Sequence, residues 1–167
     1  MQNYNWNYPT TMWVGENRIK DLGSACKKLN INKLDYLKIE TQGAELEVLK
    51  GMENFRPLLI KVEAHIFSMY KGVPGWNKLL DYLYELNYIA IDLKGIGDHN
   101  TRLPAEADIL FIPNFSNDEV KKIIFQSKEK FLSLMLIFGQ INLLKIISRR
   151  LNLSIDGLEN FQDFYFN

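Results

Sequence analysis

The sequence contains a single cysteine, Cys26, among its 167 residues. An internal disulfide needs two cysteines, so a disulfide-stapled fold is excluded, and we expect a protein of the reducing cytoplasm. The sequence also lacks an excess of either charge, because 20 basic residues balance 20 acidic ones. Proteins that bind nucleic acids usually carry a clear positive excess, so we expect no nucleic-acid partner.

Targeting and membrane signals are also scarce. The N-terminal segment MQNYNWNYPTTMWVG has no basic region followed by an apolar run, so we do not interpret it as a secretory signal. The most apolar stretch, Phe131–Ile147, is interrupted by polar residues, and we expect no transmembrane span. Its apolar positions cover more than one helical stripe, which predicts burial, self-association or docking on a partner through this segment. Because basic residues follow the apolar face, a role at a membrane surface is an alternative.

An alternation of strands and helices is the main signal that is present. The apolar content of 47% is globular, and the length suits about one domain. The predicted elements, in order, are a strand at Leu34–Glu40, a helix at Ala44–Glu53, a strand at Pro57–His65, a helix at Trp76–Leu86, and strands at Tyr88–Leu93 and Ala107–Ile112. This order predicts an α/β fold with a mostly parallel sheet. No helix separates the last two strands, so we expect that pair to be antiparallel.

The flanking segments suggest how the chain is divided. Glu16–Asn30 has helical periodicity, and Trp13 and Val14 could end an earlier strand. Downstream, a helix is predicted from Asp118 to about Lys130, capped by Ser116 or Asn117. We therefore predict an α/β domain over residues 1–116 and a helical C-terminal extension over 117–167.

Charged residues recur near the ends of two predicted strands. Lys38 and Glu40 share one face of the first, and Lys61, Glu63 and His65 share a face of the second. If these strands are parallel neighbours, both glutamates lie near the carboxyl edge of the sheet, where α/β proteins bind ligands. Glu40, Gln42, Glu63 and His65 would then line one site.

Simpler interpretations of these residues remain open. Each Lys–Glu pair could be an ordinary ion pair, and this is our preferred interpretation for Lys38 and Lys61. A metal site of Glu40, Glu63 and His65 is compatible with the ligand types, but the spacing is no known metal signature. The backbone amides at Gly43 could approach a ligand, although no phosphate-binding loop is present. His99 lies in a predicted loop and is expected to be exposed.

The segment LDYLKIETQGAELEVLKG, residues 34–51, resembles the signature of FkbM-type methyltransferases. In that family a hydrophobic strand ends in Lys-Ile-acidic, and a short turn leads to Gly-Ala-Glu and Leu-x-Gly. The strand that ends at Glu63, the step into Tyr88 and the strand at Ala107–Ile112 are similar as well. The resemblance covers roughly residues 17–114, with Glu40 where aspartate is usual and Gln42 where glutamate is common.

The resemblance implies a Rossmann-like fold that uses S-adenosylmethionine to methylate hydroxyls of sugars or secondary metabolites. It implies that Glu40, Gln42 and Gly43 contribute to cofactor binding. His65 would be the general base, and Glu63 would orient His65 or the acceptor. Transfer also requires the acceptor to be held in line with the methyl group.

A glycine-rich cofactor turn of the type acidic-x-Gly-x-Gly is not found in the sequence. Our first hypothesis is therefore the carboxyl-terminal half of a methyltransferase domain, either a fragment or one piece of a split enzyme. The second is a non-catalytic interaction module on the same fold. A generic carbohydrate-binding α/β domain is a third, supported only by the aromatic content. Whether the chain is itself an enzyme is left open.

Overall fold

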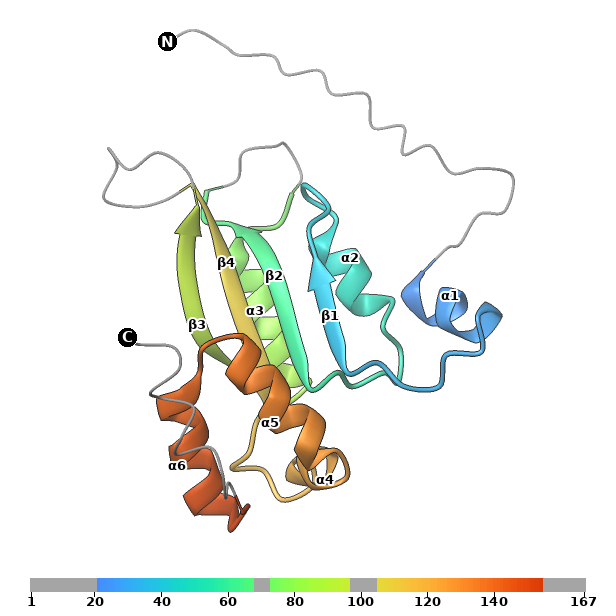
Figure 1. Cartoon of the computed structure of the whole chain (residues 1–167). Coiled ribbons are helices and arrows are strands. Elements are labelled where there is room, and N and C mark those ends of the chain that lie inside the picture. The colour runs from blue at the N-terminus through green and yellow to red at the C-terminus, as the bar shows by residue number, and fades with distance from the viewer. Residues whose placement is uncertain (1–20, 68–72, 97–104, 155–167) are drawn as a thin grey trace, which may run out of the picture.

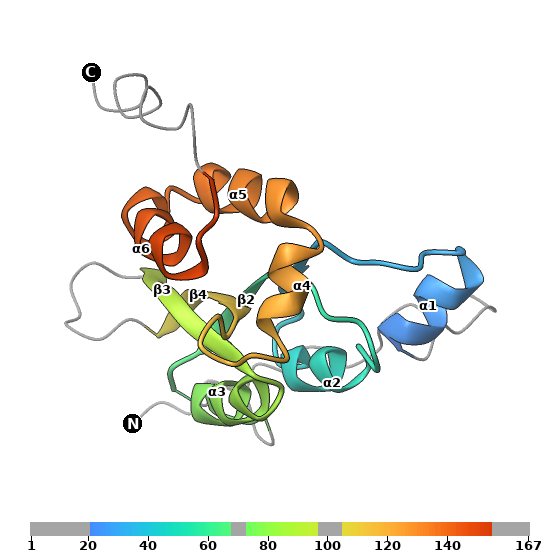
Figure 2. The same cartoon turned by 90° about the horizontal axis from the view of Figure 1, so that it is seen from below.

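The computed structural model describes residues 21–67, 73–96 and 105–154. In this part of the chain a four-stranded sheet lies between two layers of helices (Figures 1 and 2). Helices α2 (Glu45–Lys50) and α3 (Trp76–Glu85) cover one face. The other face, which we call the tail face, is covered by α4 (Lys121–Phe125), α5 (Lys128–Ile137) and α6 (Ile141–Leu151). Helix α1 (Leu22–Lys28) lies to the side of the sheet, beyond α2.

The sheet confirms the α/β class but corrects the expected strand directions. Its strands are β1 (Tyr36–Ile39), β2 (Leu59–His65), β3 (Tyr88–Ile96) and β4 (Glu106–Pro113), in the order β1-β2-β4-β3. Only β1 and β2 are parallel neighbours, since β4 lies between β2 and β3 and runs antiparallel to both. The prediction of a mostly parallel sheet is therefore wrong for the described strands, which form a mixed sheet. The antiparallel pairing of the last two strands is confirmed.

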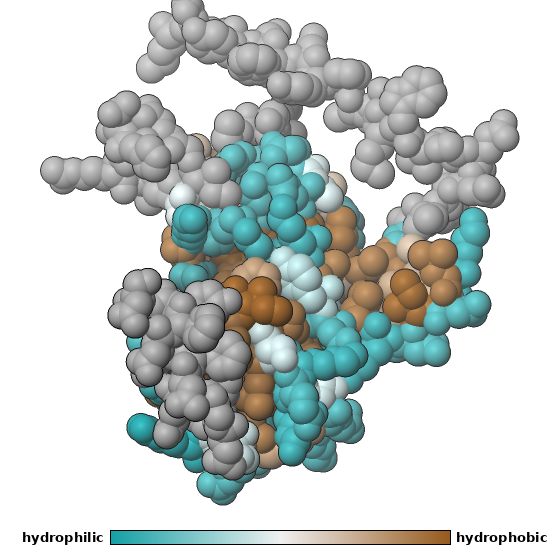
Figure 3. Space-filling model, viewed as in Figure 1, coloured by the Kyte–Doolittle hydropathy of each residue, from teal (hydrophilic) through white to brown (hydrophobic). Residues whose placement is uncertain are grey.

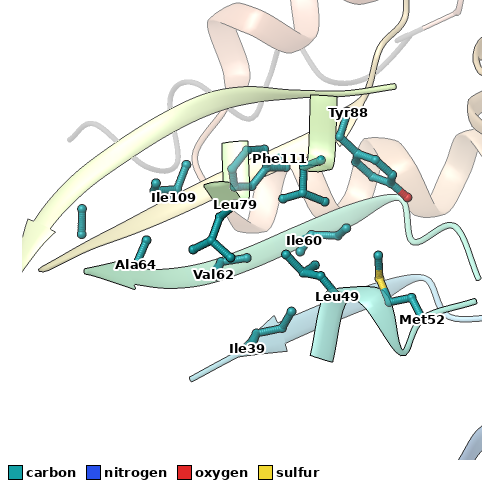
Figure 4. Close-up of a cluster of buried hydrophobic side chains, with 12 residues drawn as sticks. Ile39, Leu49, Met52, Ile60, Val62, Ala64, Leu79, Tyr88, Ile109 and Phe111 are labelled. Atoms are coloured by element: carbon teal, nitrogen blue, oxygen red, sulfur yellow. The ribbon is translucent and has the colours of Figure 1, made fainter. Parts of the chain in front are cut away.

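The main core lies between the sheet and helices α2 and α3 (Figure 4). Alternate residues of β2, namely Ile60, Val62 and Ala64, point into it. Tyr88 is buried at its end, and the Tyr88 hydroxyl donates a hydrogen bond of 2.8 Å to the carbonyl of Pro57. A buried phenol needs such a partner, and this bond joins the start of β3 to the chain that enters β2.

A second core lies between the tail face and α4–α6. Leu59, Leu110 and Ile112 from the sheet meet Phe131 and Ile147 from the helices. Much of the apolar segment Phe131–Ile147 is thus used in the chain's own core. None of the described helices has the length and apolar character needed to cross a membrane.

The predicted helix Asp118–Lys130 is wrong in its extent. Its residues form a turn and the short α4, and the non-helical backbone of Ser127 (φ −144°, ψ 38°) separates α4 from α5. Asn117 caps the turn before α4, because its Oδ1 accepts from the amides of Glu119 and Val120, but α4 itself begins after Val120 without a side-chain cap. The apolar segment that follows is also two helices, because Gly139 (φ +70°) reverses the chain between α5 and α6.

Strands β2 and β4 show where the tail face is left uncovered. In β4 the buried and half-buried residues alternate from Glu106 to Ile109, and every residue from Ile109 to Pro113 is buried. Strand β2 runs the other way, from a fully buried start at Leu59 to an alternating second half. The helices therefore cover one half of the tail face, and the other half is open.

Candidate functional site

Charged side chains occupy the open half of the tail face. Figure 3 shows the hydrophilic surface that results above the helices. The residues that the strand registers place on this half are Lys38 on β1, Lys61, Glu63 and His65 on β2, Glu106 and Asp108 on β4, and Lys94 on β3. It includes the carboxyl ends of β1 and β2, where the sequence predicts a site.

Two ion pairs organise the lysines of the open half. The Lys38 ammonium pairs with Glu40, as expected, and lowers the pKa of the Glu40 carboxyl below its ordinary value. Lys61 pairs with Asp108 of β4, with Nζ and Oδ2 2.7 Å apart, rather than with Glu63. Asp108 was missed as a partner because the sequence did not indicate that β4 would lie beside β2.

Gln42 and Glu63 come together at this edge, as the sequence predicts. The Gln42 Nε2 donates a hydrogen bond of 2.9 Å to the Glu63 Oε1. Burial raises the pKa of the Glu63 carboxyl, and the nearby carboxylates of Glu106, Glu40 and Asp108 raise it further, against the effect of Gln42. Glu63 is therefore a carboxyl group with an increased tendency to hold a proton.

His65 is almost fully buried, with 3% of its surface exposed. Its Nδ1 lies 3.1 Å from Oε1 of Glu106, the residue directly opposite His65 in the antiparallel register. The carboxylate nearest this nitrogen is thus not that of Glu63. The only sequence signal for Glu106 was an acidic residue at the start of the last strand, and its significance depends on the position of β4. The other histidine, His99, lies outside the described residues.

The turn after β1 is held closed by Glu45, which sequence analysis did not single out. This buried carboxylate accepts hydrogen bonds from the Gly43 amide at 3.0 Å and from both the amide and the hydroxyl of Thr41. Gly43 itself has φ +117°, and a Cβ there would lie 2.7 Å from Cγ2 of Val73. The Gly43 amide is therefore already bonded within the protein. The signal for this role was an acidic residue in the first turn of the helix that follows Gly43.

We also searched the described residues for a metal site and for a pocket. No group of three or more His, Cys, Asp or Glu side chains in this part of the chain is placed to hold a metal ion. A shallow depression of about 310 Å³ lies between Asp35 and α5, and no residue of the candidate site lines it.

Comparison with known families supplies the context for this geometry. Residues 14–90 match the model of the methyltransferase FkbM domain. This segment is similar to the FkbM methyltransferase domain. It contains Glu40, Gln42, Gly43, Glu63 and His65, whereas Glu106 and Asp108 follow the match. No curated protein and no solved structure matches the chain.

FkbM methyltransferases generally depend on S-adenosylmethionine, and the described residues fit that cofactor in part. Glu40 and Gln42 are exposed at the sheet edge, and their carboxylate and amide could bond to its polar groups. Gly43 fits less well, because its amide is bonded to Glu45 and Val73 lies against its Cα. A cofactor would thus meet side chains here rather than a cradle of free backbone amides.

Proposed function

We propose that this chain forms the acceptor side of an FkbM-type methyltransferase site. It would act in transfer of a methyl group from S-adenosylmethionine to a hydroxyl of a sugar or secondary metabolite. The observation that carries the proposal concerns β1 and β2, the strands that lie wholly within the family-matched segment. Both end on the half of the tail face that α4–α6 leave uncovered.

The proposed roles follow from the positions of the side chains. Glu40 and Gln42 would hold the cofactor, and Gly43 would shape the turn that presents them. When bound, the cofactor supplies an electrophilic methyl group. Glu63, fixed by Gln42, would accept a hydrogen bond from an acceptor hydroxyl and so orient it.

His65 would take the proton from the acceptor hydroxyl. The imidazole lies against the Glu106 carboxylate through Nδ1, and imidazole is the side chain most often used as a general base. Glu106, rather than Glu63, supports His65 in this proposal. The single Cys26 is buried, which is compatible with the cytoplasmic location that we also propose.

The role of His65 is tested by substitution. In an assay where a family segment with the glycine-rich turn is supplied together with the chain, His65→Ala should reduce methyl transfer by roughly 10²–10⁴-fold. Lys78→Ala, on the exposed side of α3, serves as the control and should leave turnover unchanged. Undiminished turnover in His65→Ala would remove His65 from the role of base.

A requirement for further cofactor-binding sequence is tested by calorimetry. We propose that the glycine-rich turn comes from outside these 167 residues, because the sequence holds no acidic-x-Gly-x-Gly segment. Titration of the chain with S-adenosylmethionine should then show no micromolar binding. Tight binding by the chain alone would contradict this part of the proposal.

The second candidate is a non-catalytic interaction module. The burial of His65 favours it, since a histidine with 3% exposure that contacts a carboxylate can simply complete the core. In that case His65→Ala would lower the free energy of unfolding without any activity to lose.

A further inference from the structure

Strand β3 leaves one edge of the described sheet without a partner strand. It pairs with β4 on one side, and no described strand lies on the other. Ala90 and the residues from Asp92 to Gly95 are exposed. An extended edge of this kind presents unpaired backbone amides and carbonyls and is a template for another strand.

We propose that two copies of this chain pair through β3, with their Asp92–Lys94 segments antiparallel and related by a two-fold axis. This proposal does not depend on the proposed function. It rests on the edge position of β3, on its charges and on the exposed Leu93.

The charges lie on one face of the sheet. Asp92 is opposite Leu110 and Lys94 is opposite Asp108, so both side chains point to the tail face. Neither of them forms an ion pair with a described residue, and the Asp92 Oδ2 accepts a hydrogen bond of 2.9 Å from Gln140. Two opposite charges are thus held side by side at the edge, each with capacity for a partner.

The pleat of the strand limits how two copies can pair. Directly opposed residues in an antiparallel pair point to the same face. A two-fold axis perpendicular to the sheet must therefore lie midway between the two copies of one residue, which then oppose each other. An axis at Asp92 would place Asp92 against itself, and an axis at Lys94 would place Lys94 against itself. An axis at Leu93 places Asp92 opposite Lys94 twice, and the charges select this register.

The same register brings the two copies of Leu93 together on the opposite face. Leu93 is 50% exposed, an unusual state for a leucine in the middle of a strand that carries one face of a core. Pairing would remove apolar surface of both leucines from water while the charges pair on the tail face.

The irregularity in β3 limits how tightly two copies of the chain can associate. The register with β4 shifts between Ala90 and Asp92, so the regular part of the edge is short. Few residues can pair, and we expect a weak, reversible dimer, with association detectable between about 10 µM and about 1 mM protein.

Sedimentation velocity on the 167-residue chain tests the proposal over this range. Asp92→Lys and Lys94→Asp each create two like-charge contacts at the axis and should weaken association by about tenfold or more. An equimolar mixture of the two variants places Lys opposite Asp at both positions, and association should return. Asp81→Lys and Lys78→Asp, on the exposed side of α3, are the matched charge controls and should behave like the parent.

The outcomes separate this edge from other surfaces. Recovery in the mixture cannot arise from unfolded variants, so it would support the proposed register directly. A parent chain that stays monomeric at about 1 mM would overturn the proposal. So would association that ignores both charge changes but is lost in Ile137→Ser, because Ile137 is 73% exposed within the segment Phe131–Ile147.

A cross-linking measurement checks the position of the axis. Leu93→Cys places two thiols opposite each other only in the Leu93-centred register, and the native Cys26 is buried and does not compete. Mild oxidation should give a disulfide-linked dimer of Leu93→Cys but not of Asp81→Cys. Equal cross-linking of the two variants would contradict the register.

Discussion

The two halves of the tail face use the same strands for different purposes. In the covered half, Leu59 and Ile112 pack with residues of α5 and α6 in an apolar core. In the open half, which is two residues further along the same face of β2, Lys61 and then Glu63 replace the apolar residues. The comparison teaches that one end of β2 and of β4 packs in the apolar core, whereas the other end carries charged side chains. The boundary between the two ends lies where the helical tail stops covering the sheet.

The covered half should respond most strongly to substitution. Phe131 on α5 is fully buried against the sheet, so Phe131→Ala should lower the free energy of unfolding by about 3–5 kcal/mol. Ile137→Ala on the same helix is the control, and since Ile137 is 73% exposed it should change stability by less than about 0.5 kcal/mol. Urea denaturation measures both. Similar small effects at the two positions would show that the tail does not dock as described.

Alanine substitution at two glycines with positive φ should have effects of intermediate size. Gly43 borders the open half and Gly139 joins the helices of the covered half. Alanine should cost about 1–2 kcal/mol at Gly139, where a Cβ has open space and only the backbone is strained. The cost should be larger at Gly43, about 2–3 kcal/mol, because the Cβ also meets Val73.

A second substitution isolates the steric part of the Gly43 effect. Val73→Ala combined with Gly43→Ala should recover part of the lost stability, since it removes the methyl group that the new Cβ would meet. Thermal denaturation of the single and double variants gives the coupling. Purely additive effects would assign the whole cost to the backbone.

The smallest predicted effect concerns the pH dependence of the open half. The pKa of Glu63 is raised in the folded protein, so over the range between its ordinary value of 4.5 and the raised value the folded chain binds more protons than the unfolded chain. Ionisation of Glu63 therefore lowers stability as the pH rises through this range. Glu63→Gln should be more stable than the parent at pH 7, and the difference should disappear at low pH.

Glu40 provides a control of opposite sign for this prediction. Its pKa is lowered by Lys38, so its ionised form stabilises the fold at neutral pH and this contribution is lost as the pH falls. Glu40→Gln should therefore lower stability slightly at pH 7. If both variants shifted stability in the same direction, the assigned environments of the two carboxyl groups would be wrong.

Local pattern was sufficient to predict the strands and the positions of Gln42 and Glu63. Apolar runs with turn signals gave the strands that end near Glu40 and His65, and the parallel pairing of β1 and β2 brings Gln42 to Glu63. Glu106 and Asp108 could not be assigned from pattern alone. Their contacts with His65 and Lys61 depend on which strand β4 pairs with, and short apolar strands carry little information about that choice.

The helical tail was predicted in composition but not in shape. Periodicity indicates helix on both sides of Ser127, and nothing in the local sequence shows that the backbone turns at this residue. The turn is selected because it lays α5 across the sheet and buries Phe131. Tertiary burial outweighs the modest cost of ending one helix and starting another.

The central place of β4 has a consequence for how the chain folds during synthesis. Strand β3 leaves the ribosome before β4, yet β4 is the one described strand that it pairs with. The sheet therefore cannot grow one strand at a time from the N-terminal side, and Tyr88–Ile96 must wait for Glu106–Pro113 before its backbone is satisfied. The family-matched segment ends at residue 90, before β4 begins, so a chain released at that point would hold the signature residues without the strand that unites the sheet.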